Sequence, residues 1–558
     1  MSSASSVAEP NHSRRQVILR LAAIFGVVAV AVAIAVQYVR HNAEPILRQR
    51  IVETLSLRFH CPVELDRIHI SAMQGLFVTG EGLRIPNPTR EAHAVPLAVI
   101  RSFQFRTDFR ALLHPSTSVG IVYVQGLEVH IPPTSHGSPD VDDDSARLRF
   151  TISHLICDDA QLFIENSDPL KQPLLFHIQH LELTDIVWHK PVHYDATLIN
   201  PKPTGLIHAI GTFGPWNASA PRDTPLDGNY DFSRAALNTI RGLGGTLSSN
   251  GHFAGRLGKM TIDGVTDTPD FSLDTSSLPL PLHTEFHAIV DGSTGDTRLD
   301  SVRARLQHSD FTARGTVLRT PAGHDIALEV EMPNARIEDV LQLAVRSRRP
   351  LMRGALTLHA RLHVPPGPLR VAQKIQLEGR FSIDGVSFTD PVMQAKINNL
   401  SQRAQGHPAE PLVTGDNQSD TATTSAMRAE FVLRTSLITV RSLRYQIPGA
   451  LLLLDGVYGL DGQVFEFNGH ARTVATASQM TTGWKSILLQ VVDPLLKKNG
   501  AGMEIPVSIS GTGGDFQFGL ALQQRSTEEM KQDLGNIGHR EQGQRPYPRP
   551  WGAHPHKD

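Results

Sequence analysis

The sequence has 558 residues, of which 40% are apolar and 19% are charged, a balance typical of folded chains. A chain of this length exceeds what one hydrophobic core usually organises, so we expect two or more structural units. Lys and Arg total 53 against 55 Asp and Glu, which leaves no basic field to attract nucleic acid. This charge balance argues against a DNA or RNA partner.

A transmembrane anchor is predicted at residues 17–39. Residues 21–36 (LAAIFGVVAVAVAIAV) are apolar without interruption, and the run extends to residue 39. A helix needs about twenty residues to cross the hydrocarbon layer, and residues 17–19 add to this one if Arg20 reaches toward the headgroups. Arg14, Arg15 and Arg20 precede the run, which predicts a cytoplasmic tail at residues 1–16 and a non-cytoplasmic body.

A cleavable signal peptide is the competing interpretation of this run. Such a peptide has a shorter apolar stretch that ends at small residues, whereas here the run ends in Gln37, Tyr38, Val39 and Arg40. We therefore favour an uncleaved anchor. No second apolar run of this length occurs in the sequence, so we expect a single-pass protein.

Few helices are predicted after the anchor. Residues 45–57 have apolar side chains near helical spacing, which predicts a short amphipathic helix at the membrane exit. A helix at residues 336–345 follows Asn334, a suitable N-cap, and another is predicted at residues 391–400. Residues 484–496 form the strongest amphipathic pattern outside the membrane region, although Pro494 kinks or shortens it.

The rest of the chain alternates between apolar and polar residues, which is typical of β-strands with one apolar face. Antiparallel pairing is the arrangement that this pattern favours. We therefore predict a mainly β fold, in which the transmembrane helix is followed by an extended, curled antiparallel sheet with a few short helices. Clear examples of the alternation are residues 68–70, 103–105, 127–131, 148–152, 302–306, 326–332, 356–364, 375–383, 431–433, 452–454 and 465–467.

Three stretches interrupt this pattern with polar, turn-rich sequence and are expected to be unstructured: residues 134–145, 402–425 and 523–558. They suggest a division into structural regions. The predicted organisation is a tail at 1–16, the anchor at 17–39, an N-terminal β region at 40–133, a linker at 134–145, a middle β region at 146–320, a C-terminal β region at 321–522 and a disordered tail at 523–558.

The 26 histidines do not form a recognisable metal site. His359 and His363 share one strand face but lie about 13 Å apart at roughly 3.3 Å per residue, too far to share an ion. His283 and His287 (HTEFH) resemble a zinc-protease motif only superficially, because the glutamate is misplaced and the surroundings suggest a strand. No metal or other cofactor is expected.

Enzyme motifs are also missing from the sequence. No phosphate loop, dinucleotide fingerprint or G-x-S-x-G nucleophile elbow occurs, and residues 511–514 (GTGG) are more simply a turn between strands. Cys61 and Cys157 are either buried free thiols or, in an oxidising compartment, the two halves of a disulfide. We therefore expect a protein that is not an enzyme.

The layout resembles the AsmA-like family of bacterial envelope proteins, which includes the TamB and YhdP type. The resemblance covers residues 40–133 and 320–522. It lies in the anchor, the amphipathic helix and short strands that turn on glycines. The matching segments are 68–77 (IHISAMQGLF), 80–87 (GEGLRIPN), 119–131 (VGIVYVQGLEVHI), 352–358 (MRGALTL), 377–381 (LEGRF), 431–440, 445–450 (YQIPGA), 454–458 (LDGVY) and 467–471 (FNGHA).

This resemblance implies a periplasmic body anchored in the bacterial inner membrane, with a curled sheet whose apolar face forms a groove for phospholipid acyl chains. The implied role is lipid transfer in cell-envelope and outer-membrane assembly, and the family has no catalytic residues to carry over. By their place in the alternating pattern, seven side chains are predicted to line the groove: Leu356, Leu358, Leu362, Phe381, Ile383, Phe431 and Leu433.

Two alternatives stay open. The apolar face could be the closed core of an ordinary β-sandwich, because a period-2 sheet needs only some cover for that face. The protein could also be a non-catalytic, membrane-anchored scaffold that binds other envelope proteins through exposed edges or helices.

Overall fold

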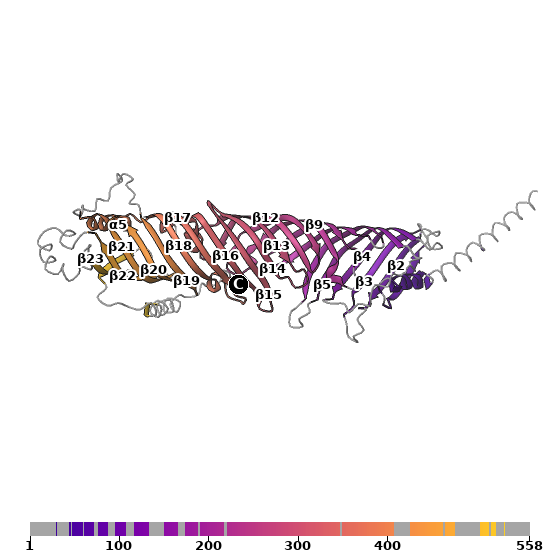
Figure 1. Cartoon of the computed structure of the whole chain (residues 1–558). Coiled ribbons are helices and arrows are strands. Elements are labelled where there is room, and N and C mark those ends of the chain that lie inside the picture. The colour runs from indigo at the N-terminus through magenta and orange to yellow at the C-terminus, as the bar shows by residue number, and fades with distance from the viewer. Residues whose placement is uncertain are drawn as a thin grey trace, which may run out of the picture. The chain divides into compact units, whose positions relative to one another are not determined.

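Figure 1 shows a computed structural model of the whole chain, drawn as a cartoon. The fold is described for the residues whose placement it defines. These are residues 30, 44–45, 47–57, 59, 61–71, 76–87, 95–107, 117–132, 150–165, 173–187, 190–216, 220–345, 349–406, 425–460, 464–474, 503–512, 515–520 and 529–530.

The chain divides into two compact units. Unit one consists of Met1–Ser167, Pro173–Leu198 and Gly211–Thr224, and unit two of Asp168–Gln172, Ile199–Ile210 and Pro225–Asp558. The division therefore lies inside the middle β region that the sequence suggests at 146–320. Each unit is built on a sheet, and each is described separately below.

In unit one, six strands pair in sequence order. All neighbours are antiparallel except β4 and β5, which run parallel, contrary to the antiparallel pattern expected from the sequence. Parallel neighbours need a long connection, and the 18 residues 132–149 between these two strands supply it. The strands are β1 (Glu64–Ser71), β2 (Leu76–Ile85), β3 (Ala98–Thr107), β4 (Thr117–Ile131), β5 (Phe150–Ile164) and β6 (Leu174–Ile186), with β7 (Val192–Pro201) after them.

The helix predicted at residues 45–57 is confirmed, since residues 44–45 and 47–57 are helical, and we call it the N-terminal helix. It packs on the apolar face of unit one, where Leu47 is 8% exposed and joins a cluster with Leu65, Ile68 and Phe103. Its polar side chains also bind the outer edge of β1. The Arg48 side chain donates to the Leu65 carbonyl at 2.7 Å, and a Glu44 carboxylate oxygen accepts from the Ile70 amide at 3.1 Å. The helix therefore covers both the apolar face and the free edge of this sheet.

In unit two, successive strands pair antiparallel from β9 to β24, apart from the two-residue β10, which pairs with β12. They lie side by side and strongly tilted in one curled sheet (Figure 1). The strands are β8 (Thr204–Phe213), β9 (Pro225–Ala236), β10 (Leu243–Gly244), β11 (Thr246–Arg256), β12 (Lys259–Leu273), β13 (Leu280–Val290), β14 (Thr297–Leu306), β15 (Ser309–Thr320), β16 (Gly323–Arg336), β17 (Met352–Val364), β18 (Gln376–Phe388), β19 (Ala426–Arg434), β20 (Leu437–Ile447), β21 (Ala450–Gly459), β22 (Val464–Thr473), β23 (Met503–Thr512) and β24 (Asp515–Leu520).

The period-2 pattern gives the unit-two sheet two chemically different faces. We call the face that carries Val330, Leu358 and Leu454 the inner face, because these side chains belong to one buried hydrophobic cluster. The opposite, outer face carries charged side chains such as Arg303 and Arg361, whose side chains are 78% and 81% exposed. The sheet therefore curls toward its apolar face and turns its charges to solvent.

Short helices line the two long edges of the unit-two sheet. α3 (Ile337–Ala344) and α5 (Pro391–Ala404) lie at the edge where β16 and β18 end, which we call the α3 edge. α4 (Val371–Lys374) lies at the opposite edge, where β17 ends and β18 begins, which we call the α4 edge. Two 3₁₀ turns, η1 (Pro221–Asp223) and η2 (Leu237–Thr239), flank β9.

The structure confirms the helices predicted at 336–345 and 391–400 and corrects their ends. Asn334 lies within β16 and is not the N-cap of α3, which is Arg336 with no side-chain capping bond. α3 is fixed instead by Asp339, 2% exposed, whose carboxylate accepts from the Ser309 hydroxyl at 2.7 Å. α5 extends to Ala404, into the stretch 402–425 that the sequence analysis expected to be unstructured.

The prediction of a mainly β fold with a curled sheet and few helices is confirmed. In the part of the chain that the structure describes, no helix is long and apolar enough to cross a membrane. The predicted anchor at 17–39 lies outside the described residues apart from Val30, and the linker at 134–145 and the helix at 484–496 lie wholly outside them. In the tail at 523–558 only residues 529 and 530 are described, and they are helical.

Candidate functional site

The seven predicted lining residues lie together on the inner face, on three neighbouring strands. On β17 and β18, Leu356 pairs with Ile383, Leu358 with Phe381, and Leu362 with Leu377. β19 continues the same rows, because Leu377 pairs with Leu433 and Gly379 with Phe431. The Phe381 and Phe431 rings contact each other at a centroid distance of 6.0 Å.

Burial divides these seven residues into two groups. Leu356, Leu358, Ile383 and Leu433 are sealed, at 2%, 8%, 3% and 7% exposure, whereas Leu362, Phe381 and Phe431 are only partly buried against them. Leu356, Leu358 and Ile383 belong to the cluster that Met393, Ile397 and Ala404 of α5 join at the α3 edge, whereas Leu433 lies toward the α4 edge. Part of the predicted lining is therefore closed core, and part keeps an accessible apolar surface.

The cover of the apolar face differs between the two units. In unit one the N-terminal helix packs on the hydrophobic cluster. In unit two the described strands β9 and β11–β24 form a single layer, and the described helices that contact the inner face lie at its α3 edge. Among the described residues of unit two, no second sheet covers the middle of this face, where large apolar side chains such as Phe381 and Phe431 are only partly buried.

The two long edges of the unit-two sheet meet each other. At the α3 edge, residues 241–242 and Asp274 lie beside the end of β12; at the α4 edge, residues 365–374 follow β17. Arg241 donates from its guanidinium to the Pro368 carbonyl at 3.0 Å, and its own carbonyl accepts from the Val371 amide at 3.0 Å. Arg370 forms an ion pair with Asp274 at 3.1 Å. Because the sheet curls toward its apolar face, this edge junction closes the curl over the inner face.

Glycine at position 242 permits this close approach. Gly242 has a φ of +91°, a conformation that residues with a side chain rarely adopt. A Cβ atom here would lie 2.9 Å from the Val371 backbone nitrogen and 3.2 Å from the Arg370 Cβ. The two edges therefore touch at their backbones, with no room for a side chain between them.

The inner face is not uniformly apolar. Near β9, β11 and β12 three hydroxyls form a chain in which the Tyr230 and Ser249 oxygens lie 3.1 Å apart and Thr266 donates to Ser249 at 3.1 Å. Burial raises the pKa of Tyr230, so its hydroxyl stays protonated across the physiological range. This end of the inner face therefore offers neutral hydrogen-bonding groups beside the apolar surface.

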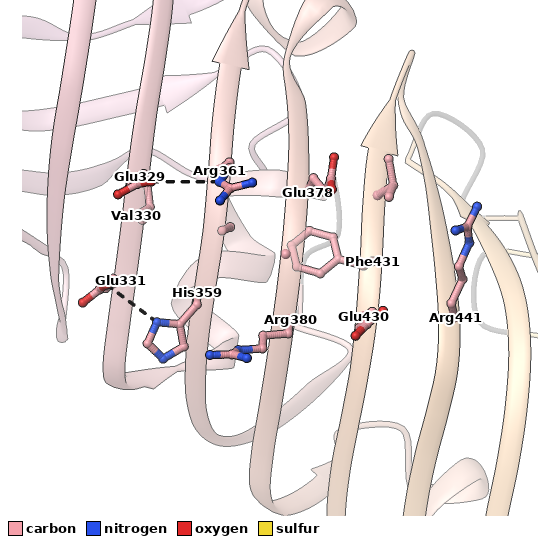
Figure 2. Close-up of a pocket in the computed structure, with 13 residues that line it drawn as sticks. Glu329, Val330, Glu331, His359, Arg361, Glu378, Arg380, Glu430, Phe431 and Arg441 are labelled. Carbon is pink, nitrogen blue, oxygen red and sulfur yellow. Dashed lines mark ion pairs between the residues drawn. The ribbon is translucent and has the colours of Figure 1, made fainter.

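The outer face carries a shallow depression of about 580 Å³ over β16–β20. Figure 2 shows its charged lining, which the strand register arranges in rows of mixed sign. One row is Glu331–His359–Arg380–Glu430–Arg441, and the other is Arg314–Glu329–Arg361–Glu378. Opposite charges therefore lie on adjacent strands along each row, an arrangement that does not oppose strand pairing.

Several of these charged side chains have no close ion-pair partner among the described residues. Arg361 and His359 lie 3.9 Å from Glu329 and Glu331, marked by dashed lines in Figure 2. In the described part of the chain, Arg380, Arg441, Glu378 and Glu430 form no ion pair. A surface with separated charges of both signs fits another mixed-charge protein surface better than a strongly anionic or cationic ligand.

Histidines elsewhere on the strands are paired with carboxylates of their neighbours. His283 and His287 lie on β13, as their surroundings predicted, 2.6 Å from Asp267 and 2.7 Å from Asp263. His363 lies 2.7 Å from Asp325. Across the described ranges, no group of three or more His, Cys, Asp or Glu residues is placed to hold a metal ion.

Both cysteines are buried free thiols in unit one. Burial raises the pKa of Cys61, and it raises the pKa of Cys157 to about 11. At neutral pH these groups are therefore protonated thiols, which are poor nucleophiles and poor metal ligands.

We predict that unit two loses stability in acid because of His324. Loss of surrounding water lowers the pKa of His324 at the start of β16, and the cations Arg319, Lys202 and Lys374 lower it further. Because the folded-state pKa lies below the unfolded value of about 6.5, the unfolded chain takes up a proton at His324 more readily than the folded chain does. The free energy of unfolding therefore decreases as pH falls below about 6.5. Thermal unfolding from pH 8 to 5.5 should show a larger drop in midpoint for the wild type than for His324→Gln. An identical pH dependence of the two proteins would contradict this role.

The edge junction and the hydroxyl chain were not predicted from the sequence. Residues 365–369 (PPGPL) are a turn-rich signal for a long connection, but nothing in them identifies Arg241 or Asp274 as partners. Serine, threonine and glycine at inner-face positions of β11 and β12 could have indicated that this part of the inner face is more polar than the rest.

The fold and the site together define a class of protein: a curled, mainly β-sheet body with an apolar inner face and a charged outer face. Comparison with protein-family models, with curated proteins and with solved structures finds no match for this chain.

Proposed function

We propose that this protein binds phospholipid acyl chains along the inner face of unit two, as a non-catalytic lipid-handling protein of the bacterial envelope. The observation that carries the proposal is the partly exposed apolar surface of Leu362, Phe381 and Phe431 on a single-layer sheet. Exposed apolar area of this kind costs roughly 25 cal/mol per Å² in water, and an acyl chain would remove that cost.

The proposed cellular setting follows from the sequence. An anchor at residues 17–39 would hold the chain in the inner membrane, with its body in the periplasm. The layout resembles the AsmA-like family, whose implied role is phospholipid transfer during outer-membrane assembly. The edge junction supports this proposal, because it would shield a bound acyl chain from water over part of the inner face.

Photolabelling of the full-length protein tests the proposal. The protein is placed in phospholipid vesicles that contain a lipid with a diazirine in its acyl chain. The labelled peptides are then mapped by mass spectrometry. We expect adducts at inner-face positions such as Leu362 and Phe431, and none at their outer-face neighbours Arg361 and Val432. Labelling of the anchor serves as the positive control. Adducts confined to residues 17–39 would refute lipid binding by the sheet.

A scaffold function is the second candidate, and the outer-face depression favours it. Arg380, Arg441, Glu378 and Glu430, which form no ion pair with other described residues, are suited to recognise a mixed-charge surface of another envelope protein. The two functions use opposite faces of one sheet, so the same photolabelled protein separates them. Protein adducts through a photoreactive residue at 441 without lipid adducts at 431 would favour the scaffold.

A further inference from the structure

Basic side chains from four segments of unit two meet at the edge junction. They are Lys202 in the β7–β8 turn, Arg241 after η2, Arg319 at the end of β15 and Lys374 in α4. Burial lowers the pKa of His324, and Arg319, Lys202 and Lys374 lower it further, so these three cations lie within electrostatic range of one side chain. We call the four basic side chains the cation cluster.

Hydrogen bonds hold the segments of the cation cluster together. The Thr204 amide donates to the Thr239 hydroxyl at 3.3 Å, which ties the β7–β8 turn to η2. The Gly367 amide donates to the Ala322 carbonyl at 3.0 Å, which ties the β17–β18 connection to the β15–β16 turn. The bonds of Arg241 across the edge junction join these two pairs of segments. The cluster therefore has a fixed framework.

The nearby carboxylates do not neutralise the cation cluster. Asp274 is engaged by Arg370 at 3.1 Å, and an Asp296 carboxylate oxygen accepts from the Arg319 backbone amide at 2.8 Å. The three members of the cluster other than Arg319 form no ion pair with a described residue. Like charges held close together repel one another, and a bound anion would remove that repulsion.

The cation cluster lies beside the accessible apolar surface of the inner face. Lys374 precedes Leu377 by three positions, at most about 10 Å at roughly 3.3 Å per residue. Leu377 pairs with Leu362 on one side and with Leu433 on the other. An acyl chain that lies on Leu362 and Phe431 and runs toward the α4 edge would therefore bring its polar end to the cluster.

We propose that the cation cluster binds the phosphate of the phospholipid whose acyl chains lie on the inner face. The inference rests on the proposed lipid function, and it adds the chemistry of the headgroup and the direction in which the lipid lies. Lys and Arg bind phosphate oxygens through charge-assisted hydrogen bonds. Lys374 donates to the Gly367 carbonyl at 3.3 Å and Arg241 donates one side-chain hydrogen bond, so both keep further N–H donors for the phosphate.

Two lipids with the same photoreactive acyl chain test this inference in the full-length protein. Phosphatidylcholine vesicles contain a trace of either phosphatidylglycerol or diacylglycerol, which has no phosphate, and adducts are normalised to those of the anchor. We expect phosphatidylglycerol to label the region of Leu362 and Phe431 at least about fivefold more than diacylglycerol. Equal labelling by the two lipids would overturn the cation site and leave lipid binding intact. No inner-face labelling by either lipid would overturn both.

A matched pair of double variants shows whether the cation cluster causes the preference. Lys202→Gln with Lys374→Gln should abolish it. Lys259→Gln with Lys396→Gln removes the same charge from β12 and α5 and should leave it unchanged. Persistence of the preference in the first double variant, or the same loss in both, would contradict a role for the cluster. The wild-type comparison of the two lipids needs no variant, so it decides even where the first double variant is unstable.

Inorganic phosphate distinguishes a lipid headgroup from a free anion, because both present the same oxygens to the cation cluster. With the proposed site, an excess of inorganic phosphate should leave the preference for phosphatidylglycerol in place, since the acyl chains hold the lipid as well. If inorganic phosphate abolishes the preference, the cluster is a site for the free anion and the headgroup assignment is wrong.

Discussion

Replacing Phe431 with glutamate is expected to reduce acyl-chain photolabelling of unit two by about tenfold or more while the protein stays folded. The Phe431 ring is only partly buried, so a carboxylate at this position can reach water without opening the core. An acyl chain that packed on the ring would instead meet a charge. The measurement is adduct yield per protein, together with the thermal midpoint of each variant.

Two matched variants serve as controls for this experiment. Val432→Glu places the same charge on the next residue of β19, which faces outward, and should leave labelling unchanged. Leu356→Glu buries a charge at a position that is 2% exposed and should unfold the sheet around it. If Phe431→Glu unfolds the protein as Leu356→Glu does, the inner face is a closed core and lipid binding is refuted.

The faces of the sheet were predictable because they depend on local alternation. The pattern Leu356, Leu358, Leu362 on one strand identifies which side chains share a face whatever the strand pairs with. It does not say how deeply each is buried, because that depends on α5 and the neighbouring strands. For this reason Leu358 proved sealed and Leu362 only partly buried, although the sequence treats them alike.

Contacts between distant segments were not predictable from one sequence. The β4–β5 pair is parallel, and alternation of apolar and polar residues does not specify the direction in which neighbouring strands run. The edge junction joins Arg241 to Pro368 across 127 positions, and neither residue belongs to a periodic pattern. The hydrogen bond from the Asn468 amide to the Met530 sulfur was missed for a related reason, because these two residues lie 62 positions apart and share no periodic pattern.

Gly242→Ala is expected to separate the two edges of the unit-two sheet. The new methyl group would lie 2.9 Å from the Val371 nitrogen, at a position whose φ of +91° already disfavours a side chain. The hydrogen bond from the Val371 amide to the Arg241 carbonyl would be lost with it. Hydrogen exchange at Val371 should accelerate by at least about tenfold, which corresponds to roughly 1.4 kcal/mol of local opening.

Gly367→Ala is the control for this prediction, because Gly367 lies on the same connection and also has a positive φ, of +121°. A Cβ atom there meets nothing within 4 Å, so the variant carries the backbone strain without the steric clash. It should leave exchange at Val371 close to wild type. Equal acceleration in the two variants would mean that strain in the connection, rather than contact between the edges, controls the junction. If the junction shields bound acyl chains, only Gly242→Ala should also speed the release of photoreactive lipid.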